Sequence, residues 1–223
     1  MDTIFRGDLA SATGRARAWL DSLLVDHGVL RLVWSNWATV VPGRLYRCNH
    51  PTPGRLARVA RRHGLRSVIN LRGATGNGSD ALSRERAARL DLRFIDVPIS
   101  SREAPSREQV LALAEALRSA EPPVLLHCKS GADRAGFAAA VFLVIEGRTV
   151  DDAIRHLSLR FGHLRRSRAG VLDSVLLHFA REAEGRKSFL NWVQEDYDPV
   201  AATAAFPARR LASFISDHVL ARE

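Results

Sequence analysis

Residues 127–136, which read HCKSGADRAG, constrain this chain more than any other stretch. The apolar run Val124–Leu126 before them predicts a buried strand, and the apolar, alanine-rich segment 137–145 after them predicts a buried helix. A polar turn between a strand and a helix N-terminus binds anions, because unpaired backbone N–H groups and the helix dipole both point into it. Gly131 allows the backbone to curl so that successive N–H groups converge on one centre. The segment therefore predicts an anion-binding loop.

Two side chains of this loop carry the chemistry. Cys128 is expected at the base of the loop, where positive potential favours the thiolate. Arg134 can donate two parallel hydrogen bonds to phosphate oxygens. A buried structural cysteine is the alternative, but such a residue has no need of a glycine turn, an arginine and a strand-to-helix junction together. A thiolate beneath a bound phosphate is a nucleophile directed at phosphorus.

The pattern His-Cys-x5-Arg at residues 127–134 resembles the signature of the cysteine-dependent phosphatases, the superfamily of protein tyrosine and dual-specificity phosphatases, in a form similar to the bacterial members. The resemblance covers roughly residues 39–160. It implies a reaction without metal or cofactor, in which Cys128 attacks phosphorus and water hydrolyses the resulting cysteinyl-phosphate. The sequence shows no His/Asp/Glu cluster with metal-ligand spacing. The resemblance also implies that Arg134 and the loop residues before it hold the phosphate; these are Lys129, Ser130, Gly131, Ala132 and Asp133.

Three carboxylates compete for the role of general acid, which protonates the leaving oxygen. Members of the superfamily usually supply an Asp from the loop after the strand that precedes the catalytic strand. Here that loop is residues 100–105, and Glu103 is its only carboxylate. Asp133 lies beside Arg134. Asp96 lies inside the preceding strand, and this position favours a half-buried acid whose hydrogen bonds are satisfied within the protein. Glu103 is favoured, and the other two acids, or a reaction without a dedicated acid, stay open.

Position 135 departs from the superfamily pattern. Many members carry a hydroxyl residue directly after the arginine, where it can hydrogen-bond the departing thiolate in the second step. Ala135 lacks that hydroxyl. We therefore expect slower hydrolysis of the intermediate, unless Ser130 substitutes.

The charge of the chain bears on its substrate. The sequence holds 33 Lys and Arg against 24 Asp and Glu, a net charge of +9. Together with Lys129 and Arg72, this balance favours a substrate with more than one phosphate or carboxylate group. A phosphorylated protein is expected, with phosphotyrosine favoured. An inositol phosphate or phospholipid headgroup is one alternative, and binding of phosphorylated partners without turnover is the other. No basic run interleaved with aromatic residues indicates a nucleic-acid partner.

Strand and helix patterns alternate along the middle of the chain, which is typical of a mostly parallel sheet flanked by helices. We predict an α/β fold similar to the dual-specificity phosphatases, with an N-terminal helical extension (1–38), a phosphatase core (39–160) and a C-terminal helical part packed on the same domain (161–223). The expected elements are a hairpin over 39–48, strands over 67–71 and 93–99, and helices over 53–63, 79–90, 106–119, 150–158, 167–183, 187–196 and 207–221. Ser106 and Gln109 predict a capping box.

Apolar residues at helical spacing predict an amphipathic helix over 14–34. This helix is expected to pack on the domain, and the alternative is peripheral contact with a membrane through Arg15, Arg17 and Arg31. No secretory signal is apparent, and no apolar run approaches the about 18 residues that span a bilayer. The two cysteines do not make a disulfide framework. These features predict a cytoplasmic protein.

Overall fold

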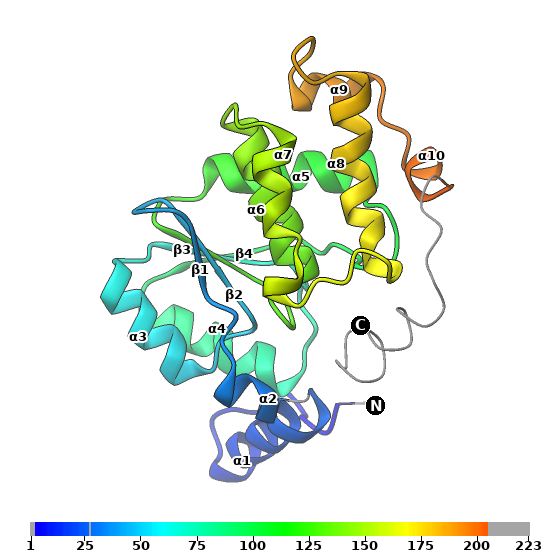
Figure 1. The fold of residues 1–223 in the computed structure, drawn as a ribbon. Helices are drawn as coiled ribbons and strands as arrows, with labels where there is room; N and C mark the ends of the chain where they lie inside the picture. The colour runs from blue at the N-terminus through cyan, green and yellow to red at the C-terminus, as the bar shows by residue number, and fades with distance from the viewer. Residues whose placement is uncertain (1–2, 27, 205–223) are drawn as a thin grey trace. The chain divides into compact units, whose positions relative to one another are not determined.

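The computed structural model describes residues 3–26 and 28–204, so the helix predicted over 207–221 lies outside the described residues. The chain divides into two compact units (Figure 1). The sheet unit comprises the residues up to Asp96 together with Ala120–Ser130. The helical unit comprises Val97–Ser119 together with the residues from Gly131 onward.

The sheet unit is built on five strands in the order β1-β2-β5-β3-β4. Their bounds are β1 Ala38–Val41, β2 Leu45–Cys48, β3 Ser67–Asn70, β4 Arg93–Asp96 and β5 Val124–His127. β1 and β2 pair antiparallel, as the predicted hairpin requires, and all other pairs are parallel. The predicted α/β class, a mostly parallel sheet flanked by helices, is therefore confirmed.

Two helices of the sheet unit pack on one face of the sheet: α3 (Pro53–His63) and α4 (Gly78–Arg89). Helix α3 begins after the N-cap Thr52 and ends at Gly64, whose φ of 63° is in the left-handed region that a glycine C-cap adopts. The packed cluster on this face includes residues from both helices and three strands, namely Leu56, Ala60, Ala87, Tyr46, Val68 and Leu125. Leu125 of the central strand β5 is thereby packed in the same cluster as both helices.

The prediction of a single helix over 14–34 is wrong. The segment forms α1 (Ala12–Leu20), a π-helical turn (Asp21–Val25) and α2 (Gly28–Val33). The break occurs at Asp21, whose buried carboxylate accepts hydrogen bonds from the backbone N–H of Ile4 at 2.8 Å and of Gly78 at 2.7 Å. These two bonds draw the carboxylate toward the start of α4, and the helix widens there by one residue per turn.

Helix α1 packs on the sheet unit, as the sequence predicts. Ala18 is buried in a cluster with Phe5 and Leu82, and Trp19 packs against that cluster. The guanidinium of Arg15 forms an ion pair with Glu85 at 2.8 Å, so this arginine is engaged within the protein. No helix in the described part of the chain is both long enough and apolar enough to span a bilayer.

The helical unit contains α5 (Arg107–Ser119), α6 (Asp133–Ile145), α7 (Val150–Ala153), α8 (Val171–Glu182), α9 (Phe189–Glu195) and α10 (Pro199–Ala204). The capping box before α5 is confirmed, since the backbone N–H of Ser106 donates to Gln109 at 2.9 Å and that of Gln109 donates to the Ser106 hydroxyl at 3.3 Å. Helices α5, α6, α8 and α9 pack together (Figure 1). The helices predicted over 150–158 and 167–183 are shorter than expected, because 3₁₀ turns take up Ile154–His156 and Arg168–Gly170.

Candidate active site

The nucleophile candidate follows the central strand of the sheet unit. All four residues of β5 are buried, and Cys128 directly after them is also buried. The chain segments after β3 and β2 hold this end of the strand, because the N–H of Leu71 donates to the His127 carbonyl at 2.9 Å and the N–H of His50 donates to the Lys129 carbonyl at 3.2 Å. Cys128 therefore lies where the carboxyl ends of three parallel strands meet, which is where open α/β sheets bind ligands.

A carboxylate from the N-terminal segment lies between two cations of the sheet unit. Both terminal nitrogens of Arg72 contact the Asp26 carboxylate at 2.9 Å, and both side chains are almost fully buried. The Lys129 ammonium is 3.9 Å from the same carboxylate. Nearby, the side-chain amide of Asn36 donates to the Ser130 carbonyl at 2.9 Å. The structure thus brings Lys129 and Arg72 together around Asp26.

The sequence does not predict the contacts that Asp26 and Asn36 make with Arg72, Lys129 and Ser130. Both belong to the segment 1–38, which was expected to be an extension outside the core. The one signal in the sequence is that Asp26, with Asp21, is one of two acids in the amphipathic segment 14–34. An ion pair with Arg72 does not follow from that signal, because 46 positions separate the two residues.

In the helical unit, Asp133 begins α6 and accepts a hydrogen bond from His163, with Oδ1 2.7 Å from Nδ1. The other ring nitrogen of His163 is 2.5 Å from an oxygen of Asp173, and Arg165 contacts the second oxygen of Asp173 at 2.8 Å. The His163 and Asp173 side chains are no more than 1% exposed. An imidazole that bonds two carboxylates can donate to both only when it is protonated.

The pKa of His163 reflects this arrangement. Burial alone lowers the pKa, because it disfavours the charged imidazole, but the hydrogen bonds from the ring to Asp133 and Asp173 raise the pKa to about 9. The ring is therefore an imidazolium at neutral pH. It fixes the Asp133 carboxylate at the helical end of the predicted anion-binding loop.

The remaining loop residues of the helical unit follow the predicted local geometry. Gly131 has a φ of 73°, the left-handed conformation that a curled loop requires at this position. Arg134 is the second residue of α6 and is 8% exposed, while Ala132 and Ala135 are fully buried. Helix α6 begins at Asp133, earlier than the predicted start at residue 137, so the first turn of the helix contains Arg134.

The three candidate acids differ in their partners. Arg84 contacts both oxygens of Asp96 at 2.8 Å, and the Asn70 amide donates to the same carboxylate at 2.9 Å. Asp133 is bonded to His163. Glu103 is exposed in the loop before α5, and no hydrogen bond or ion pair joins it to another residue in the described ranges.

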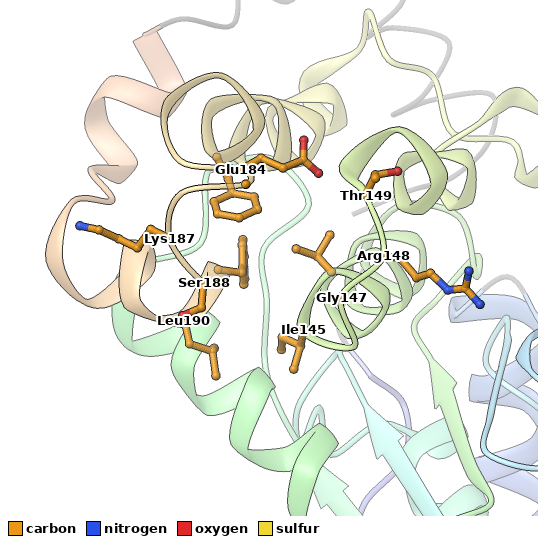
Figure 2. Close-up of a pocket in the computed structure, with 12 residues that line it drawn as sticks. Ile145, Gly147, Arg148, Thr149, Glu184, Lys187, Ser188 and Leu190 are labelled. Carbon is orange, nitrogen blue, oxygen red and sulfur yellow. The ribbon is translucent and has the colours of Figure 1, made fainter.

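A cavity of about 430 Å³ lies in the helical unit, among the ends of α6, α8 and α9 (Figure 2). Its lining includes Val144, Phe179 and Phe189, and none of the predicted site residues. Arg148 and Lys187 extend away from it (Figure 2). The cavity therefore does not have the character of a phosphate site.

Among residues 3–26 and 28–204, no group of three or more His, Cys, Asp or Glu side chains is arranged to hold a metal ion.

Comparisons with known proteins agree with this fold. A family model described as "DSP-PTPase phosphatase fused to NAD+ Kinase" matches residues 42–169, which is more than half of the chain. No curated protein sequence matches. Among solved structures, P. aeruginosa TpbA, a cysteine-to-serine variant in complex with pTyr, is 22% identical, with a TM-score of 0.50 over 67% of this chain and 97% of that one. Tk-PTP in its active form is also 22% identical, with a TM-score of 0.50 over 67% of this chain and 99% of that one. These likenesses show the fold, and the family match shows that the chain belongs to the PTP-NADK family of DSP-type phosphatases.

Proposed function

We propose that this protein hydrolyses phosphomonoesters through a cysteinyl-phosphate intermediate on Cys128, as a protein tyrosine or dual-specificity phosphatase. The observation that carries the proposal is the position of Cys128, directly after the central parallel strand and before a loop with a left-handed Gly131 and a helix N-terminus. Membership of a phosphatase family supports the reaction class.

The proposed reaction has two steps. The Cys128 sulfur attacks phosphorus, the bond from phosphorus to the ester oxygen breaks, and Glu103 gives its proton to that leaving oxygen. Water then attacks phosphorus and passes a proton to the Glu103 carboxylate, while the sulfur leaves as a thiolate and phosphate is released. Arg134 and the loop N–H groups bind the non-bridging oxygens throughout, so that catalysis rests on positioning and electrostatic stabilisation.

Glu103 is favoured as the acid because the other two carboxylates are engaged. Asp96 is held by Arg84 through both oxygens, and Asp133 is bonded to the imidazolium of His163. A general acid has to exchange its proton with substrate and with water, which a carboxylate locked in an ion pair does poorly. Glu103 is exposed and has no such partner within the described ranges.

A substrate with one phosphate group is favoured over an inositol phosphate or a phospholipid headgroup. Lys129 and Arg72 were the residues that favoured several anionic groups, and the Asp26 carboxylate already compensates part of their charge. The complex of P. aeruginosa TpbA with pTyr is consistent with a phosphotyrosine substrate for a protein of this fold. We therefore propose phosphorylated protein as the substrate class.

The test compares two single-cysteine variants. Cys128→Ser should abolish hydrolysis of a phosphotyrosine peptide while the peptide still binds, because the hydroxyl is a far weaker nucleophile than a thiolate. Cys48→Ala is the matched control: burial raises the pKa of the Cys48 thiol, so it is not a nucleophile at neutral pH and its loss should spare turnover. Full turnover by Cys128→Ser would falsify the assignment. A phosphoserine peptide and inositol phosphates, ranked by kcat/KM against the phosphotyrosine peptide, test the substrate class.

A further inference from the structure

A second cavity, of about 410 Å³, lies in the sheet unit, and none of its lining residues belongs to the proposed nucleophile loop. Its walls are helix α3 and the chain that leads into β1. Its lining is strongly basic and includes one indole: Ser35, Trp37, Thr39, Arg55, Arg58, Val59, Arg62 and His63. The volume is that of a small-molecule site.

Three arginines form one row along this cavity. Arg55, Arg58 and Arg62 are spaced i, i+3 and i+7 on α3, so their side chains share one face of the helix about 5–6 Å apart at each step. Arg55 donates to the Asn49 side chain at 3.5 Å. Arg58 and Arg62 are exposed and form no hydrogen bond or ion pair with any residue that the structure describes. Like charges at this spacing repel one another, and a bound anion would remove the repulsion.

The aromatic residues of this cavity are firmly packed. The indole of Trp37 stacks on His63, with ring centroids 4.9 Å apart, and on Tyr46, at 5.3 Å. Trp37 and Val59 also pack against the buried cluster between α3 and the sheet. The fold therefore already fixes the aromatic part of the cavity, and a ligand would have to order only the arginine side chains.

We propose that this cavity binds a small molecule with two or more phosphate groups. Guanidinium groups pair with phosphate through two parallel hydrogen bonds, and a row of three arginines matches successive phosphates better than one carboxylate or one phosphate. Ser35 and Thr39, which carry hydroxyl side chains, also line this cavity. Linear polyphosphates and inositol polyphosphates share this chemistry.

The experiment is a calorimetric titration of the full chain, carrying Cys128→Ser so that nothing is hydrolysed, with inorganic tripolyphosphate at about 0.15 M ionic strength. Arg58→Gln with Arg62→Gln removes two cations from the cavity. Arg61→Gln with Arg118→Gln is the matched control, since both residues are exposed, lie outside the cavity and carry the same charge. The double variant in the cavity should bind tripolyphosphate at least tenfold more weakly, because each substitution removes a charge-assisted hydrogen bond. The control double variant should bind it less than about twofold more weakly. Equal losses of tripolyphosphate affinity in the two double variants, or no binding of tripolyphosphate to the Cys128→Ser protein, would overturn the proposal.

The position of the ligand is read from the indole N–H resonance of Trp37, one of four tryptophans, assigned with Trp37→Phe. The resonance should move on titration, and a stationary resonance would overturn the proposal. Parallel titrations with myo-inositol hexakisphosphate show which polyphosphate class binds more tightly. In the protein with Cys128 intact, the double variant Arg58→Gln with Arg62→Gln should leave hydrolysis of a phosphotyrosine peptide unchanged. Failure of this site and failure of the proposed reaction are therefore distinguishable.

Discussion

The two ends of the predicted anion-binding loop are held by opposite arrangements of charge. At the strand end, in the sheet unit, one carboxylate, Asp26, lies between two cations, Arg72 and Lys129. At the helix end, in the helical unit, one cation, His163, lies between two carboxylates, Asp133 and Asp173. Both central groups are buried and each contacts two partners of opposite charge, so removing a central group breaks two contacts at once.

The difference predicts different responses to pH. The charges of the strand-end arrangement belong to an aspartate, an arginine and a lysine, whereas histidine is the side chain that ordinarily titrates near neutral pH. The helix end depends on an imidazolium, which titrates. Removing Asp26 should therefore act at every neutral pH, whereas the contribution of His163 should fade as the solution becomes alkaline.

The largest expected effect is that of Asp26→Asn. The substitution leaves the Arg72 guanidinium buried without its carboxylate, and breaking a buried pair in this way costs about 3–5 kcal/mol of unfolding free energy. Urea unfolding measures the loss. The matched control is Glu121→Gln, which removes the partner of Arg66 in a pair whose side chains are 59–61% exposed and should cost less than about 1 kcal/mol. Similar losses for the two variants would show that Asp26 is not the centre of the strand-end arrangement.

The second prediction concerns stability against pH. Because the pKa of His163 rises from 6.5 in the unfolded chain to about 9 in the folded one, its contribution is complete below pH 6.5 and is lost as pH rises through 9. The shift corresponds to about 3 kcal/mol. We expect the unfolding free energy of the wild type to fall toward pH 9 by this amount relative to His163→Gln, measured by urea unfolding at several pH values. Parallel pH profiles for the two proteins would contradict the helix-end arrangement.

The third prediction asks whether the N-terminal segment seats Asp26. A Cβ at Gly78 would lie 2.2 Å from the carbonyl oxygen of Ala18 in α1, so Gly78→Ala forces α1 away from α4 and should cost about 1–3 kcal/mol. Gly54→Ala, at an open position of α3, is the control and should change stability by less than about 1 kcal/mol. Thermal unfolding compares the two. If Gly78→Ala were as mild as the control, the contact between α1 and α4 would not hold the segment that carries Asp26.

Local chemistry explains what the sequence could predict. The β5–loop–α6 order, the left-handed Gly131 and the Ser106 capping box all depend on residues a few positions apart, and all are found in the structure. The alternating strand and helix patterns were likewise enough for the α/β class, since each element shows its own periodicity.

The charged centres at the two loop ends could not be predicted in the same way. Asp26 pairs with a residue 46 positions away, and His163 with one 30 positions away. Neither pairing leaves a periodic or spaced pattern, so each residue alone is indistinguishable from a surface acid or a core histidine. The break of the N-terminal helix at Asp21 has the same origin, because the N–H group of Gly78 that it binds is 57 positions distant.

The smallest expected effect is at position 135, on the helix side of the loop. Ala135 is fully buried in the first turn of α6, and Ala135→Ser would supply the hydroxyl that can stabilise the departing thiolate. One hydrogen bond of about 1 kcal/mol corresponds to roughly a fivefold faster second step. Rapid-mixing kinetics should show an unchanged first step and a higher steady-state rate. Ala138→Ser, also fully buried and one turn further along α6, makes the same chemical change and should bring no acceleration. Equal rates for the two variants would show that hydrolysis of the intermediate does not depend on a hydroxyl beside Arg134, and would turn attention to Ser130 on the strand side.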